Sequence, residues 1–191
     1  MPRKALYNIE QVLSDAEDVF LEHSFHGAAM DELIARTEFN RRGFYIEFKN
    51  KKQFLYRVLA HYQESRLLPL QTQLQEKQGL VSIQSFFNDY ISLIDGRGCL
   101  LINSVTELGI DDINIREIGR HYLDGLQIAF ISCLEQAMEH GQLKVGVDIE
   151  SAALQLTCFV QGLAVNAVLC QDSEEMQITI QSLLAPLLPN A

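Results

Sequence analysis

The scarcity and position of proline constrain the fold of this 191-residue chain more than any other feature of its sequence. Proline lacks a backbone N–H and interrupts helices, and only four prolines occur, at Pro2, Pro69, Pro186 and Pro189. In the long stretches between them, apolar residues recur at intervals of three and four, whereas alternating strand-like runs are nearly absent. The sequence therefore predicts an all-α fold of about nine helices.

The N-terminal part of the chain predicts a longer helix followed by short ones. An apolar stripe from Ile9 to Phe20 predicts a first helix that ends before Gly27. The stretch AAMDELIAR predicts a short second helix with Leu33 facing the core, and residues 37–39 are too few for more than a turn. The order is therefore long helix, short helix, tight turn.

Two asparagines predict where the next helices begin. An asparagine side chain before a helix accepts a hydrogen bond from a free backbone amide of the first turn. Asn40 and Asn50 are therefore expected to cap the third and fourth helices. The fourth helix continues toward Pro69, where we expect a kink or an interruption. It connects a first unit, residues 1–50, to a second unit, residues 51–191.

Longer amphipathic segments follow Gly79. Glycines and the stretch HGQLKVGVD separate helices that we expect at about 82–95, 98–108, 114–140, 149–170 and 174–187. No internal repeat or low-complexity linker divides the chain, so the fourth helix is expected to join the two units stiffly.

Composition excludes several classes of protein. Hydrophobic residues make up 48% and charged residues 21% of the chain, as in folded soluble proteins. The basic start lacks a following apolar run, and no stretch reaches the roughly 18 apolar residues of a membrane span. We therefore expect a cytoplasmic protein without a membrane segment. The cysteines show no close pairing and are expected to be reduced thiols: Cys99, Cys133, Cys158 and Cys170.

Motifs for catalysis and for metal binding are not found in the sequence. No nucleophile motif, glycine-rich phosphate loop or carboxylate pair of plausible geometry occurs. His121, Cys133, His140 and Cys158 are residue types that suit zinc or copper, but no local spacing supports a site. We therefore expect no enzyme, no cofactor and no metal.

Charge is distributed unevenly along the chain, whose formal net charge is -10. Residues 36–66 contain eight Lys and Arg against three acidic residues, whereas residues 67–191 contain five against fifteen. A polyanion is attracted by the first segment and repelled by the second. The alternative interpretation of such a charge run is a solvated helix face.

Two short helices joined by a tight turn behind a longer helix have the layout of a helix-turn-helix unit. With the third helix in a major groove, Arg41 and Arg42 reach base edges, and Gly43 removes a side chain at the closest approach. Tyr45 can donate to a phosphate, and Lys51 stands at a helix N-terminus that attracts one. The predicted DNA contacts are Ala29, Met30, Asn40, Arg41, Arg42, Gly43, Tyr45 and Lys51.

The stretch DELIARTEFNRRGFYIEFKNKKQFL resembles the DNA-binding domain of the tetracycline-repressor (TetR) family of transcriptional regulators. The match runs from about Ile9 to Leu59, and its pattern is carried by Gly27, Ile34, Ala35, Tyr45, Phe48 and Lys51. The resemblance implies that Tyr45 and Lys51 contact phosphates and that residues 41–43 read bases. Where the family usually has glycine in the turn, this chain has Glu38, so that residue must adopt a left-handed conformation or the turn must differ.

Dimerisation is expected because one helix-turn-helix makes too few contacts for a tight specific site. By the resemblance, the last two helices form a four-helix bundle with a second copy. The expected interface is Ala152, Ala153, Leu156, Val160, Leu163, Ala167, Ile180, Leu183, Leu184 and Leu187. The alternative is that both helices are simply intramolecular core.

A ligand pocket between the bundle and the DNA-binding unit is also implied by the resemblance. The stretch RGCLLINSVTELG resembles a subgroup that includes electrophile-responsive repressors, in which Cys99 would be a reactive thiol if Arg97 lowered its pKa. Buried packing is the alternative for that cysteine. Candidate ligand contacts are Cys99, Asn103, His121, Tyr122, Phe130, Cys133 and Phe159.

These inferences predict a ligand-responsive regulator, by default a repressor, that binds a palindromic double-stranded operator as a homodimer. A small-molecule effector of unknown identity would release it. Two alternatives remain open at this point: a helical interaction module that docks an acidic partner, and a thiol-based electrophile sensor within the same family.

Overall fold

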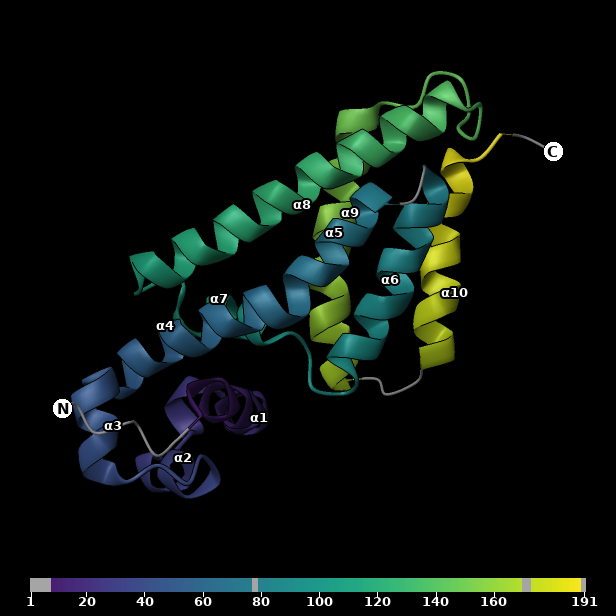
Figure 1. Cartoon of the computed structure of the whole chain (residues 1–191). Helices are drawn as coiled ribbons and strands as arrows, with labels where there is room; N and C mark the ends of the chain where they lie inside the picture. Colours follow the sequence, from purple (N-terminus) through teal and green to yellow (C-terminus); the bar gives the residue numbers. More distant parts are fainter. Residues whose placement is uncertain (1–7, 77–78, 170–172, 190–191) are drawn as a thin grey trace.

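The computed structural model describes residues 8–76, 79–169 and 173–189, and every regular element in these ranges is helical (Figure 1). The predicted all-α class is confirmed. A small three-helix unit lies at one end of the molecule, a larger helical body lies at the other, and a long rod joins them (Figure 1).

The small unit consists of α1 (Ile9–Gly27), α2 (Met30–Arg36) and α3 (Arg41–Phe48). Its core is largely aromatic, because α3 turns two phenylalanines toward the start of the rod. The ring centroid of Phe54 lies 4.9 Å from that of Phe44 and 4.4 Å from that of Phe48. This packing fixes which face of α3 remains exposed.

Both predicted asparagine caps are present. The Asn40 side chain accepts the backbone N–H of Gly43 at 2.7 Å, and the Asn50 side chain accepts that of Gln53 at 2.9 Å. Glu38 adopts the left-handed conformation expected of the turn, with φ of 50°. The turn between α2 and α3 therefore keeps its geometry although it lacks glycine.

The rod consists of α4 (Lys51–Tyr62), the π-helical turn η1 (Gln63–Leu67) and α5 (Leu68–Glu76). The π turn ends just before Pro69, whose ring would clash with the preceding turn of a regular α-helix. The predicted interruption therefore takes the form of a wider turn, and the rod continues through it into the body (Figure 1).

The body contains the remaining helices, with boundaries close to those predicted. They are α6 (Leu80–Ile94), α7 (Leu100–Leu108), α8 (Ile113–Glu139), α9 (Ile149–Leu169), α10 (Ser173–Leu184) and the short 3-10 turn η2 (Ala185–Leu187). With the rod counted once and η2 as the end of α10, the described residues form the nine predicted helices. Helix α8 runs diagonally across the others (Figure 1).

Helix α9 is long and apolar enough, by length and composition, to cross a membrane, with a mean hydropathy of 1.6 over its most apolar window. The expectation that no such stretch exists is therefore wrong by this measure. A core position accounts for much of this apolarity, since Ala153, Leu156 and Val160 are buried and α9 packs along α8.

Candidate nucleic-acid interface and effector groove

Helix α3 has one exposed and one buried face. Arg41, Arg42 and Tyr45 are exposed, whereas Phe44 and Phe48 are buried against the rod. The capping bond from Gly43 to Asn40 holds the first turn, so the two arginines project from a fixed helix end. The predicted contact face is thus exposed as one surface.

Ile46 lies on the same face and is 74% exposed, although the sequence analysis did not select it. The signal was present in the sequence. Since Phe44 and Phe48 point inward, the intervening residues must point outward, and an apolar side chain there has no core to join. Apolar side chains on a recognition helix contact the thymine methyl group in the major groove.

Most cations of the basic segment already have partners. Four of them form ion pairs, Arg36 with Glu22, Arg41 with Asp31, Lys52 with Asp112 and Arg66 with Glu17. Arg42, Lys49 and Arg57 have no ion pair within the part of the chain that the structure describes. Counting charges in the sequence therefore overstated the number of cations free to meet a phosphate.

Lys51 does not present a free ammonium group. Its Nζ donates to the carbonyl oxygens of Phe25 at 2.6 Å and Ala28 at 2.8 Å, and lies 4.5 Å from the centroid of the Phe25 ring. These carbonyls belong to the end of α1, which attracts cations. Burial lowers the pKa of Lys51, and Glu107 opposes this effect. Two of the three ammonium hydrogens therefore hold the connection between α1 and α2, and the predicted phosphate contact stays a prediction.

The other predicted contacts lie near the same surface. Ala29 is exposed, whereas Met30 is half-buried against the core. A Cβ on Gly43 would lie 2.9 Å from the Asn40 side-chain nitrogen and 3.1 Å from the Phe39 ring. A larger residue at this position would therefore displace the Asn40 cap, independently of any approach to DNA.

A joint connects α1 to the body. The helix breaks at Ser24, where φ is 57° and ψ is -178°. Glu107 of α7 accepts the backbone N–H of Phe25 at 2.7 Å and that of His26 at 2.8 Å. Burial alone would raise the pKa of Glu107, but these hydrogen bonds outweigh it and lower the pKa. This short segment is held by α7 through Glu107 and by α4 through Lys51.

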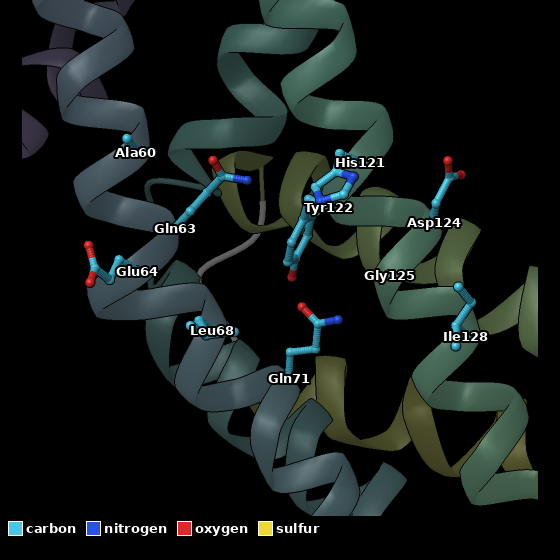
Figure 2. A pocket seen from close by; sticks show the side chains of 10 residues that line it. All are labelled: Ala60, Gln63, Glu64, Leu68, Gln71, His121, Tyr122, Asp124, Gly125 and Ile128. Carbon is cyan, nitrogen blue, oxygen red and sulfur yellow. The ribbon is translucent and has the colours of Figure 1, made fainter.

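A groove of about 600 Å³ lies between the rod and α8, a size typical of small-molecule sites (Figure 2). Two of the predicted ligand contacts, His121 and Tyr122, line it. The complete lining is Ala60, Gln63, Glu64, Leu68, Gln71, His121, Tyr122, Asp124, Gly125 and Ile128. The rod residues were missed because only the folded chain brings the π turn opposite α8.

Three predicted ligand contacts belong instead to the hydrophobic core. Phe130 is buried, with its ring centroid 5.9 Å from that of Phe87, and half-buried Phe159 lies 5.7 Å from the same ring. The Cys133 thiol donates to the Leu74 carbonyl at 2.9 Å, and burial raises its pKa to about 11. These three residues do not line the groove, because their side chains fill the space between helices.

Asn103 lies in a different place. Its side-chain amide donates to the Arg97 carbonyl at 3.1 Å, and it borders a second cleft of about 450 Å³ between α1, α7 and α9. Asn103 therefore does not line the groove beside α8, and its predicted ligand contact stays a prediction.

Comparison with known families agrees with this architecture. The family model described as bacterial regulatory proteins, tetR family, matches residues 12–58. The model described as tetracyclin repressor-like, C-terminal domain, matches residues 79–183, which is more than half of the chain. The chain belongs to the TetR family. It is thus a DNA-binding transcriptional regulator, and α2 and α3 form its helix-turn-helix.

Relatives of this TetR-family chain are similar along most of its length. The HTH-type transcriptional repressor ComR of Escherichia coli is 25% identical over 177 residues, which cover 86% of this chain and 81% of ComR. The HTH-type transcriptional repressor DhaR of Mycobacterium sp. is 23% identical over 184 residues, which cover 95% and 92%.

Solved structures of TetR-family regulators share the fold. A cysteine mutant of CifR, complexed with 26-base-pair operator DNA, has a TM-score of 0.81 at 19% identity and covers 96% of this chain and 98% of its own. The reduced form of NemR from E. coli has a TM-score of 0.78 at 20% identity, with coverage of 95% and 98%.

The residues predicted for the TetR-family dimer interface mostly face inward. Leu183 and Leu187 are half-buried, and the others are buried within the chain: Ala152, Ala153, Leu156, Val160, Leu163, Ala167, Ile180 and Leu184. That prediction is wrong for the buried eight, which pack in the protomer's own core. The opposite surface of the two helices is apolar and exposed, with Leu154, Val165, Val168 and Leu169 on α9 and Ile178 on α10.

Cys99 is fully buried at the start of α7. Burial raises the pKa of its thiol, and hydrogen bonds from the surroundings only partly offset this effect. The Arg97 guanidinium binds Asp18 at 2.6 Å rather than the thiol. The predicted activation of Cys99 by Arg97 is therefore corrected, since a buried thiol of raised pKa is not a reactive thiolate.

Proposed function

We propose that this chain is a ligand-responsive repressor that binds a palindromic operator as a homodimer and releases it when a small molecule occupies the groove beside α8. Residues 1–50 form the DNA-binding domain, and residues 51–191 bind the effector and the second copy, with α4 as the connector. The exposed face of α3, with Arg41, Arg42 and Tyr45 behind the Asn40 cap, carries this proposal. The names of ComR and DhaR as repressors, and the operator complex of CifR, support it.

The second copy packs on the outward face of α9 and α10. Val165 is 52% and Leu169 80% exposed, and a Cβ built on the exposed Gly162 meets nothing within 4 Å. An apolar face of this kind is costly in water and is buried in helical bundles. Two copies related by a two-fold axis present two α3 helices to successive turns of the duplex.

The effector acts through the rod and the joint near Ser24. A ligand shifts an equilibrium only by the difference between its affinities for the two states. The groove includes Gln63 and Glu64 of the π turn, so a ligand there contacts the rod that begins at Lys51. Movement of Lys51 relative to Glu107 displaces the end of α1 and changes the spacing of the two α3 helices.

We also propose that the chain acts in the cytoplasm and works by binding rather than catalysis. Its partner, double-stranded DNA, is found in that compartment of a bacterium. The TetR-family match supports a regulator, and the groove holds a histidine and two carboxylates without a nucleophile beside them.

Competition in fluorescence anisotropy tests the proposal against an interaction module that docks an acidic partner. Labelled operator-containing duplex should resist displacement by heparin or single-stranded DNA at moderate salt. Arg42→Ala should lower the affinity for the duplex and reduce the salt slope by about one. Arg120→Ala, an exposed arginine on α8, serves as the control and should change neither. Equal displacement by every polyanion would favour the interaction module.

A further inference from the structure

One helix of the rod and three of the body each bring one polar side chain to the same buried place. They are Tyr62 of α4 in the rod, and Tyr90 of α6, Cys99 at the start of α7 and Tyr122 of α8 in the body, and each is 5% exposed or less. The Tyr62 hydroxyl donates to the Cys99 sulfur at 3.8 Å. Burial is the main cause that raises the pKa of all three phenols, and the neighbouring Cys99 raises it further. The three phenols therefore stay neutral at physiological pH.

Two of these hydroxyls have no hydrogen-bond partner among the described residues. They belong to Tyr90, whose hydroxyl lies beside the Cys99 thiol, and to Tyr122. Leaving a buried hydroxyl unpaired is costly, and buried polar groups in proteins are nearly always satisfied. Their presence here indicates that a ligand, when bound, supplies an acceptor.

The groove reaches this cluster through Tyr122, which belongs to both. Figure 2 shows the Tyr122 side chain in the gap between the rod and α8, with its hydroxyl directed toward Gln71. Gly125, one turn further along α8, makes room for the Gln71 side chain, whose nitrogen would lie only 3.0 Å from a Cβ at this position. The Tyr122 hydroxyl is enclosed in the free protein, and a small molecule in the groove reaches it when the Gln71 side chain moves aside.

The charges around the groove restrict the ligand. Neither Lys nor Arg lines it, so an anionic group would find only the exposed imidazole of His121 as a partner and would meet the carboxylates of Glu64 and Asp124 at the open side. The inner end of the groove, at Tyr122, offers only a neutral hydrogen-bond donor. A charged group buried there would lack a counter-ion, which costs more free energy than an unpaired hydroxyl does. An organic cation could pair only with these two carboxylates, which are exposed and solvated, so the ion pairs would contribute little binding free energy.

We propose that the groove selects an uncharged, mainly apolar small molecule with one acceptor oxygen, which takes the hydrogen bond of the Tyr122 hydroxyl. Apolar contacts come from Ala60, Leu68 and Ile128, and the amide groups of Gln63 and Gln71 lie beside them. This inference rests on the proposed function only in assigning the groove to the effector.

Isothermal titration calorimetry on the full-length protein, without DNA, tests the proposal with four probes of similar size. Benzylacetone is a neutral ketone, butylbenzene lacks the oxygen, hydrocinnamate is an anion and phenylpropylammonium is a cation. Benzylacetone should bind, butylbenzene should bind about tenfold more weakly, and the two ions should not bind at millimolar concentration.

Three variants locate the binding. Tyr122→Phe should reduce the benzylacetone affinity about tenfold and leave that of butylbenzene unchanged. Its melting temperature should not fall, because the hydroxyl that it lacks has no partner in the free protein. Gly125→Leu should fill the groove and abolish binding of both probes. Tyr45→Phe, on the exposed face of α3, removes a phenol far from the groove and should change neither affinity.

The proposal is overturned if benzylacetone does not bind, if either ion binds as tightly as the ketone, or if Tyr122→Phe binds the ketone as wild type does. Because no DNA is present, these outcomes leave the operator-binding proposal standing. Conversely, loss of operator binding by Arg42→Ala has no bearing on the ketone titration.

Discussion

Glu107 of α7 accepts the backbone N–H of Phe25 at 2.7 Å, although 82 residues separate the two in the sequence. This bond, together with that from His26, ties the broken end of α1 to the body. Glu107 is therefore one of the side chains that fix the DNA-binding unit on the body, together with Lys51 at the same segment.

Glu107→Ala should loosen this joint. Removing a charged acceptor leaves two backbone amides without their partner, so we expect the free energy of unfolding to fall by about 2 kcal/mol. Hydrogen exchange should increase at Phe25 and His26, and effector addition should release less DNA. Glu135→Ala, an exposed carboxylate on α8, is the control. Unchanged exchange at the two amides would show that Glu107 does not hold the joint.

Lys51→Met should act on stability more than on the electrostatics of DNA binding. The ammonium already bonds two carbonyls, so its loss should lower the free energy of unfolding by about 1 to 2 kcal/mol. The slope of operator affinity against salt should stay close to that of wild type. A slope reduced by a full phosphate contact, as expected for Arg42→Ala, would restore the original assignment of Lys51.

Val165→Asp should disrupt the dimer. A carboxylate on the outward face of α9 would be buried without a partner between two copies. Sedimentation equilibrium should then show a monomer, and specific operator binding should fall to the level of random duplex. Val145→Asp introduces the same change at a site that is 98% exposed in a loop, and should remain dimeric. A dimeric Val165→Asp variant would place the interface elsewhere.

Ile46→Ser should relax base preference at one position of each half-site. The exposed isoleucine loses its apolar contact with a thymine methyl group, which costs about 1 kcal/mol of discrimination. Affinity measured against duplexes with thymine or uracil at each position would locate the contact. If replacing thymine with uracil never reduces wild-type binding, Ile46 does not read that methyl group.

Asp112→Asn should change the response to acid. Burial alone would raise the pKa of Asp112, but bonds from Lys52, Tyr56 and the start of α8 lower it from 3.8 to about 2. The carboxylate therefore stabilises the fold above pH 3.8, and this stabilisation is lost as the pH falls toward about 2. The stability difference between wild type and Asp112→Asn should shrink over that interval. Asp111→Asn, next to it and exposed, should show no such dependence.

Features with local causes were predictable from the sequence. The caps at Asn40 and Asn50 depend on residues three positions away, and the left-handed Glu38 follows from the length of the turn. Most helix boundaries follow in the same way from glycines and apolar spacing.

Features that depend on packing were not predictable. Helix α9 is apolar on nearly every side, so periodicity could not distinguish the buried Leu156 from the exposed Leu154. The partners of Lys51 lie more than twenty residues earlier in the chain, and the burial of Cys99 is set by four helices. Ile46 was the exception, since its outward position could have been read from its neighbours.

Selection of bound duplexes from a random pool, with the purified wild-type protein, tests the central claim most directly. Two copies of α3 held by a two-fold dimer predict an enriched palindrome whose half-site centres lie one helical turn, or a multiple of it, apart. Arg41→Ala and Arg42→Ala should change the bases enriched in both halves alike. No enriched sequence, or an enriched motif without two-fold symmetry, would contradict the claim.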